Sequence, residues 1–431
     1  MLSDKVSERR RASVWPLALL LLFLGIALTP IGPRRAIIMK LFDPGSLGWV
    51  NYPAVVAAVL MIVWGFIHRK EYDRFDIFLM YLGLVLLIPI TVSDGDVYFR
   101  KYCAALLNVA LPFFVIFQTM DRDRRRIWLG RNVKVLYVLS FILLIFGVIE
   151  MISGGALVRI VNSLFNAHGM KIGQYDSFIE ALDGGKRRFY SFWGGAMFNS
   201  LIFMGIFIIN DIYYMNIGRT YRKMLLAIVT AAGIVLCLDQ AAMILFGIYL
   251  LLSCFAQMKA GKEAEENGLS LIVCLAVGGL LIIGGGLMQI FGILDYPPVS
   301  RDMLNELRDY RANSVDSLLL YKGYGTATIY NSNFADYGDA FGLAALMMSL
   351  DYGIVFALVF TLAYFAFFTW KVLIRKKRFV CWAGITAFFI QVNLFSGFGM
   401  INYDVSWITS VFIMLAVNAV YARYDQEAFN G

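Results

Sequence analysis

Charged side chains are scarce in this sequence. Only 16% of its 431 residues are Asp, Glu, Lys or Arg, whereas 60% are hydrophobic. The mean hydropathy of +0.70 is high for the whole chain. A soluble core of this length cannot hide that much apolar surface. The composition therefore argues against an ordinary soluble protein and predicts one integral membrane domain that spans residues 1–431.

Histidine and cysteine are also few, with two and five residues. The cysteines all fall in apolar runs, with neither the spacing of a zinc site nor a disulfide framework. No Walker loop or nucleophile elbow occurs. His68 stands beside Arg69 and Lys70, as a solvated residue would, and His168 is either a general base or incidental. The sequence thus predicts no metal site and carries no signature of a soluble enzyme.

Long hydrophobic runs, by contrast, are abundant. Because a hydrocarbon core of about 30 Å takes about 20 helical residues, a window of that length predicts about twelve transmembrane helices. They lie near residues 14–31, 49–67, 77–92, 102–117, 135–152, 194–213, 224–238, 241–255, 269–293, 352–370, 379–398 and 407–421. The expected fold is an all-α polytopic membrane protein. Residues 224–256 are too many for one span, so Asp239 and Gln240 mark either a hairpin or the middle of one tilted helix.

Loop charges predict the orientation. Most of the 38 Lys and Arg residues fall on one side, in segments such as "HRKEYDRF" and "DRDRRRIWLGRNVK". The positive-inside rule then predicts that both termini are cytoplasmic. A basic cytoplasmic face also explains the net charge of +8 without a nucleic-acid partner. The basic start, "SERRRAS", precedes an apolar run without a small-residue cleavage site, so we expect an uncleaved first span.

Two long outer loops, residues 153–193 and 294–340, hold most of the remaining polar residues. Loops of this length are uncommon without a role. In the second, Arg301, Arg308 and Arg311 share one side of a predicted helix. That helix either lies on the membrane with solvated charges or presents an anion-binding stripe to a lipid phosphate.

Three segments, taken in order, resemble one family. They are "RRFYSFWGGAMFNSLIFM" (187–204), the hairpin "LCLDQAAMIL" (236–245), and "GYGTAT" (323–328), which leads to "SLDYGIVFALVF" (349–360). Together they resemble the bacterial O-antigen polymerase and O-antigen ligase superfamily. The resemblance implies a glycosyltransferase that acts on polyprenyl-diphosphate-linked glycans at the outer face of the bacterial cytoplasmic membrane.

The sequence also departs from the family. The hairpin carries Asp239 and Gln240 where the family often has Ser and Arg. The ligases share a His-Asn pair before the closing helix, whereas this region offers Asn331, Asn333, Asp336 and Asp339 without a histidine. The polymerase branch, which builds lipopolysaccharide or exopolysaccharide chains, therefore fits better than the ligase branch.

The chemistry suggests roles for particular residues. Displacing a polyprenyl diphosphate develops negative charge that fixed cations stabilise, and the acceptor hydroxyl needs a base. We expect Arg188, Asp336 and Asp339 to be catalytic, although Asp339 would serve equally as an N-cap for a helix that begins at Ala340. The expected substrate-binding residues are Arg187, Arg308, Arg311, Asn199, Asp239, His168 and Tyr324. The resemblance implies activity without a metal or other cofactor. The expected partners are the lipid-linked glycan and membrane lipid, with a chain-length regulator and a flippase as further candidates.

Another class of protein shares this topology. About twelve spans with both ends inside also suit a lipid-linked oligosaccharide flippase or another secondary transporter. Such transporters often have matching halves, but the two halves here match in neither loop length nor motif. The polar residues also gather on one side. We therefore keep the transporter as the alternative function, with an O-antigen ligase as the second alternative.

Overall fold

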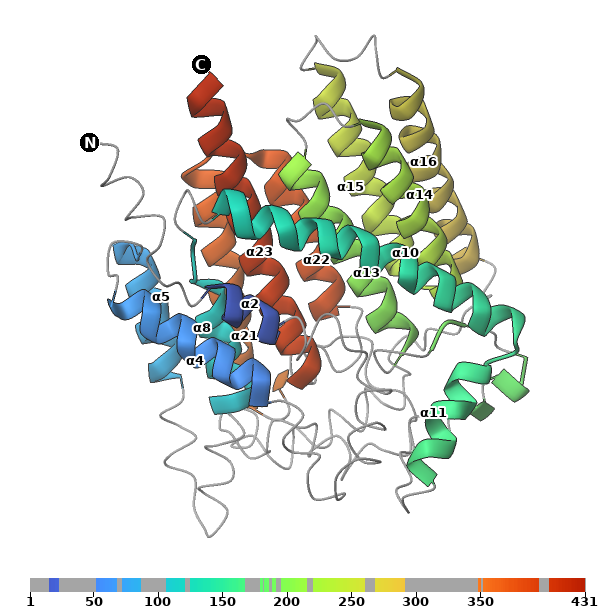
Figure 1. Cartoon of the computed structure of the whole chain (residues 1–431), viewed down its shortest axis with the longest axis horizontal. Coiled ribbons are helices and arrows are strands. Elements are labelled where there is room, and N and C mark those ends of the chain that lie inside the picture. The colour runs from blue at the N-terminus through green and yellow to red at the C-terminus, as the bar shows by residue number, and fades with distance from the viewer. Residues whose placement is uncertain are drawn as a thin grey trace.

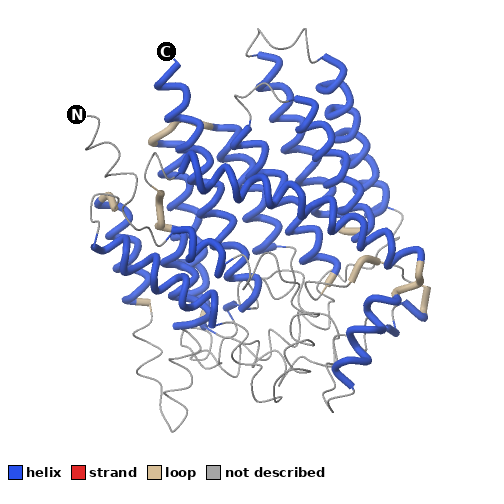
Figure 2. Tube along the Cα trace, viewed as in Figure 1, coloured by secondary structure: helices blue, strands red, loops and turns tan. Residues whose placement is uncertain are grey.

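The computed structural model describes residues 15–22, 52–67, 72–86, 106–120, 125–166, 179–180, 182–185, 188–190, 195–214, 220–259, 268–290, 348–349, 352–394 and 403–430. Within these ranges the chain is all-α, with 13 α-helices, short π-helical segments and no strand (Figure 2). The α-helices are α2 Trp15–Leu22, α4 Tyr52–Ile67, α5 Arg74–Val85, α8 Leu111–Ile116, α10 Gly130–Ile152, α11 Ala156–Asn166, α13 Ala196–Tyr214, α14 Thr220–Cys237, α15 Gln240–Lys259, α16 Gly268–Ile290, α21 Ile354–Phe368, α22 Phe379–Leu394 and α23 Tyr403–Asn430. The π-helical segments are η4 Leu106–Ala110, η5 Arg125–Leu129 and η7 Thr369–Ile374.

Six stretches of helix among the described residues are long and apolar enough to cross a membrane. They are Ile127–Ile152, Ala196–Tyr214, Gln240–Met258, Leu269–Met288, Ile354–Ile374 and Val405–Arg423. Every predicted span overlaps a described helix, but the described part of some of these helices is short, such as α2 with 8 residues and α8 with 6. The chain is thus an all-helical, multi-pass membrane protein, as expected, while about twelve crossings stay a prediction.

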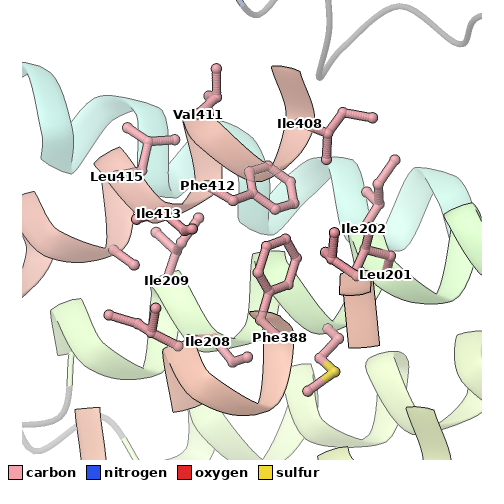
Figure 3. Close-up of a cluster of buried hydrophobic side chains, with 14 of the residues drawn as sticks. Leu201, Ile202, Ile208, Ile209, Phe388, Ile408, Val411, Phe412, Ile413 and Leu415 are labelled. Carbon is pink, nitrogen blue, oxygen red and sulfur yellow. The ribbon is translucent and has the colours of Figure 1, made fainter. Parts of the chain in front are cut away.

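Two helices form the centre of the bundle. In the apolar stretches of α13 and α23, 94% of the residues are buried. In the apolar stretch of α16 only 28% are buried, so its outer face is available to lipid. Phe388 of α22 and Phe412 of α23 pack within this core with ring centroids 5.6 Å apart (Figure 3). Gly205 of α13 lies so close to Phe412 that a Cβ atom there would be 2.2 Å from the ring. Close approach through a small residue is how membrane helices commonly pack.

The directions of three central helices follow from side-chain hydrogen bonds. Ser200, near the start of α13, bonds to Asp239 before α15, and Ser253 in the later part of α15 bonds to Asp211 near the end of α13. α13 and α15 therefore run in the same direction. Lys223, near the start of α14, pairs with Asp211, so α14 runs the opposite way.

The connection between α14 and α15 is a tight turn. α14 ends at Cys237 and α15 begins at Gln240, so only Leu238 and Asp239 join them. Leu238 has φ +51°, in the left-handed region that costs a residue with a side chain about 1–2 kcal/mol. Of the two interpretations that the sequence allowed for residues 224–256, the structure shows the hairpin.

The bundle has two chemically different ends. We call the first the Asp239 end, and it holds Glu150, Ser200, Asp239 and Gln391. The last turns of α10, α14 and α22 meet the first turns of α13 and α15 there. The opposite, basic end carries a cationic set: Arg125, Arg131, Lys134, Arg222, Lys223, Lys259, Arg375, Lys376, Lys377, Arg378 and Arg423. α23 ends at the basic end, and α10 crosses the bundle obliquely (Figure 1).

The helices that precede the two predicted long loops, α10 and α16, both finish at the Asp239 end. α10 finishes there, where Glu150 meets the segment that precedes α13. α16 also finishes there, because a Cβ atom on its Gly285 would lie 3.2 Å from the carbonyl oxygen of Gln240. The chain after Ile152 and the chain after Ile290 therefore start from the same end of the molecule.

Candidate functional site

Three of the predicted site residues lie in the described part of the chain, and all three meet at the Asp239 end. They are Arg188, Asn199 and Asp239. The other predicted residues, Arg187, His168, Arg308, Arg311, Tyr324, Asp336 and Asp339, lie outside the described residues. The site below is therefore built from the first group alone.

Asp239 is fixed by contacts from three helices. Its side chain is almost fully buried, and Oδ1 accepts a hydrogen bond of 3.0 Å from the backbone N–H of Ala242, which caps α15. Oδ2 accepts from the Ser200 hydroxyl of α13 and, over 2.7 Å, from Nε2 of Gln391 in α22. The sequence predicts a substrate-binding role, whereas the structure gives both oxygens a partner within the protein. Asp239 thus joins α13, α15 and α22.

A short segment, Arg188–Tyr190, is clamped by three other contacts. The N–H of Phe189 donates to the Leu236 carbonyl at the end of α14 over 3.0 Å, and the Phe189 carbonyl accepts from Asn199 Nδ2 over 2.8 Å. The N–H of Tyr190 donates to Glu150 Oε1 over 2.9 Å. Asn199, predicted to bind substrate, here binds the backbone. The clamp fixes the chain directly after Arg188.

Arg188 itself is left available. Its side chain is half-buried, and its Nε atom is buried without a hydrogen-bond partner in the described part of the chain. Its positive charge attracts the Asp239 carboxylate electrostatically. A guanidinium has five N–H donors in a planar fork and no acceptor, so it is suited to an anion with paired oxygens. The site can therefore hold one cation ready for a phosphate or carboxylate.

Three residues of this site were missed by sequence reasoning: Glu150, Ser200 and Gln391. Glu150 and Gln391 have exposed fractions of 1% and 0%, although each lies in a run of apolar residues. A polar residue within a predicted span is itself a signal, because it is costly in lipid and usually has a partner. Oε1 of Gln391 and Nε2 of Gln240 are buried without a hydrogen-bond partner in the described ranges, so this end retains unused polar groups.

No group of three or more His, Cys, Asp or Glu residues that could hold a metal occurs among the residues that the structure describes. The site as described has one available cation, a set of buried polar groups, and carboxylates that are engaged in holding backbone or side chains. This arrangement can bind and orient an anionic group.

The fold and site together define a class: an all-helical, multi-pass membrane protein with a buried polar site at one end of its bundle. Comparisons with protein families, curated proteins and solved structures find no match to the chain.

Proposed function

We propose that the chain is a membrane glycosyltransferase that polymerises polyprenyl-diphosphate-linked oligosaccharide repeat units into a surface polysaccharide. One observation carries this proposal. Arg188 and Asn199 come from one motif of the resemblance and Asp239 from another, and the structure brings all three to the same end of the bundle. The helices that precede both predicted long loops, α10 and α16, finish at that end.

In this proposal Arg188 binds the diphosphate leaving group. Cleaving the bond between the sugar C1 and the diphosphate leaves negative charge on the phosphate oxygens, which a positioned guanidinium stabilises in a site shielded from water. Glu150 and Asn199 hold the backbone beside Arg188, and Asp239 holds three helices together around it. The base that accepts the hydroxyl proton remains Asp336 or Asp339, as proposed from the sequence.

The charge distribution supports an outward-facing site. Among the described residues, Lys and Arg gather at the basic end, whereas the Asp239 end carries only Arg159 and Arg188. Positive residues favour the cytoplasmic side. This distribution supports a cytoplasmic C-terminus in a bacterial inner membrane, with the Asp239 end at the outer face where lipid-linked repeat units are polymerised.

A flippase or another transporter is the second candidate, and one feature favours it. Asp211 and Lys223 form a buried ion pair of 3.1 Å between α13 and α14, and buried charges in membrane proteins often mark transport paths. However, Tyr249 and Ser253 donate to Asp211, and Lys223 also donates to Ser253 and Gln257. A network this fully satisfied offers no free group to a cargo, so we favour the polymerase.

Glycan analysis of a deletion strain tests the proposal. Loss of a polymerase leaves single repeat units attached at the surface, whereas loss of a flippase leaves none exposed. The strain is then complemented with the wild type, with Arg188→Ala, and with Arg159→Ala as a matched control at the same end. Long polymer should return with the wild type and the control but not with Arg188→Ala. A deletion strain with normal polymer, or with no exposed units, would overturn the proposed function.

A further inference from the structure

A second cation site lies at the basic end, far from Arg188. The Arg222 guanidinium, on the first turn of α14, stands over two aromatic rings. Its carbon atom Cζ lies 4.0 Å from the ring centre of Tyr137 in α10 and 4.3 Å from that of Tyr214 in α13. α10, α13 and α14 pack against one another, and each thus contributes one side chain.

The two rings fix Arg222 but leave its hydrogen-bond donors unused. Aromatic rings attract a cation through their faces and accept none of the in-plane N–H bonds. No hydrogen bond or ion pair links Arg222 to another residue in the described part of the chain, and its Nε atom is buried. A buried donor without an acceptor is costly, so this group calls for an acceptor from outside the described protein.

The position of the site indicates where that acceptor comes from. Tyr214 is the last residue of the apolar stretch Ala196–Tyr214, so its ring marks one boundary of the membrane-crossing part. Tyr and Trp are enriched at such boundaries, at the level of the lipid headgroups. Arg131 and Lys134 lie on the first turns of α10, before Tyr137, and raise the positive potential there. Anionic headgroups accumulate beside cationic residues of this kind.

We propose that Arg222, Tyr137 and Tyr214 form a binding site for the phosphodiester group of an anionic phospholipid. The planar fork of Arg222 matches two phosphate oxygens, and the tyrosine rings hold that fork in one plane. The acyl chains would follow the apolar surface of α10 and α14, which carries the exposed side chains of Val135, Val138 and Ile228. This site is independent of the proposed glycosyltransferase function.

Lipid binding by the purified full-length protein tests the site directly. Native mass spectrometry counts retained lipids after mixing with phosphatidylglycerol or with phosphatidylcholine, and thermal unfolding is followed in the same samples. The wild type should retain phosphatidylglycerol in preference. Arg222→Lys keeps the charge but loses the planar fork, and it should weaken that binding about tenfold, as the loss of one charge-assisted hydrogen bond predicts.

Matched variants keep the test decisive. Arg131 stands over the single ring of Trp128, 4.9 Å away at the same end, so Arg131→Lys is the control and should bind as the wild type does. Tyr214→Phe keeps the ring and should retain lipid binding, whereas Tyr214→Leu removes the ring and should lose it. This second pair of variants tests the site independently if Arg222→Lys does not fold. Equal loss from Arg131→Lys would overturn the site in favour of diffuse charge. Equal stabilisation by inorganic phosphate alone would overturn the lipid assignment.

Discussion

Oε1 of Glu150 accepts a hydrogen bond of 2.9 Å from the backbone N–H of Tyr190. This contact joins the last turn of α10 to the segment that carries Arg188, across 40 residues of sequence. The carboxylate is 1% exposed. Its role in this contact is that of an acceptor for the backbone rather than of a group that meets substrate.

Substitutions at Glu150 separate these two roles. Glu150→Gln keeps a side-chain oxygen that can accept from Tyr190, so we expect polymer synthesis close to that of the wild type. Glu150→Ala leaves the buried N–H without an acceptor and lets the Arg188 segment shift, so the rate should fall about tenfold. Polymer length and rate are measured at matched membrane abundance. If Glu150→Gln were inactive while Glu150→Ala folded normally, Glu150 would act through its charge.

Arg188 gives the sharpest test of the chemistry. Arg188→Lys keeps the charge but loses the planar fork, so the rate should fall by about 10², the effect of removing one transition-state contact. A residue that merely anchors the chain at the interface would tolerate lysine, because either cation can reach the headgroups. The control is Arg159→Lys, an exposed residue at the same end that pairs with Asp183. Near-normal polymer from both Arg188→Lys and Arg188→Ala would remove Arg188 from the mechanism.

Local sequence signals predicted much of the fold. Apolar runs of about 20 residues located α13, α15 and α16 within a few residues, because the bilayer sets the length of a span. α10 and α23 extend beyond their predicted spans, from Gly130 and to Asn430. Asp239 and Gln240 predicted the break between α14 and α15, because polar residues in an apolar run favour a turn. The left-handed conformation of Leu238 was not foreseen, since nothing in a leucine side chain favours it.

The sequence alone did not predict which residues far apart in the chain contact one another. The charge pattern predicts that the segment "HRKEYDRF" lies on the inner side, but it gives no sign that Asp76, the residue directly after this segment, is fully buried against Lys371, 295 residues away. In the same way, nothing in the sequence indicates that Asp239 contacts Gln391, 152 residues away. The three predicted site residues that the structure describes came from motifs, whereas Glu150 and Gln391 join them through contacts of the tertiary structure.

The buried pair of Asp211 and Lys223 should govern stability rather than activity. Lys223→Met leaves a buried carboxylate without its cation, and breaking such a pair costs about 3–5 kcal/mol. The double variant Asp211→Asn/Lys223→Met removes both charges, so most of that loss should be recovered. Unfolding of the purified protein in detergent measures both changes. A double variant as unstable as Lys223→Met would show that the loss comes from packing around Lys223 instead of from its charge.

The orientation can be tested with accessible tags. Ser153 follows α10 at the Asp239 end, and Lys377 lies in the turn between η7 and α22 at the basic end. A tag after Ser153 should be reached from outside the cell, and a tag after Lys377 only from the cytoplasm. Tags after Ser314 and Gly218 should behave like the first and the second, respectively. A cytoplasmic tag after Ser314 would reverse the topology and remove the second loop from the outer face.

A cluster of four charges links α5 to η7 and should make stability depend on pH. Asp73 caps α5 and accepts from Lys371 over 2.9 Å and from Arg375 over 2.6 Å. Burial by itself raises the pKa of Asp73, but the hydrogen bond from the Asp76 N–H and the charges of Lys371 and Arg375 outweigh it. The pKa of Asp73 therefore lies below its ordinary value of 3.8.

The lowered pKa of Asp73 determines the direction in which stability changes with pH. The folded state favours the ionised carboxylate, so Asp73 stabilises the fold at pH values above 3.8 and loses that effect as the pH falls through its lower folded pKa. Asp73→Asn keeps the helix cap but removes the charge, so it should lower the stability at pH 7 by about 1 kcal/mol. The difference from the wild type should shrink below pH 3.8.

Thermal unfolding in detergent between pH 7 and pH 3 measures this difference, with Asp183→Asn at an exposed pair as the control that changes little. A gap between Asp73→Asn and the wild type that stays constant over the whole range would mean that the Asp73 charge does not stabilise the junction of α5 and η7.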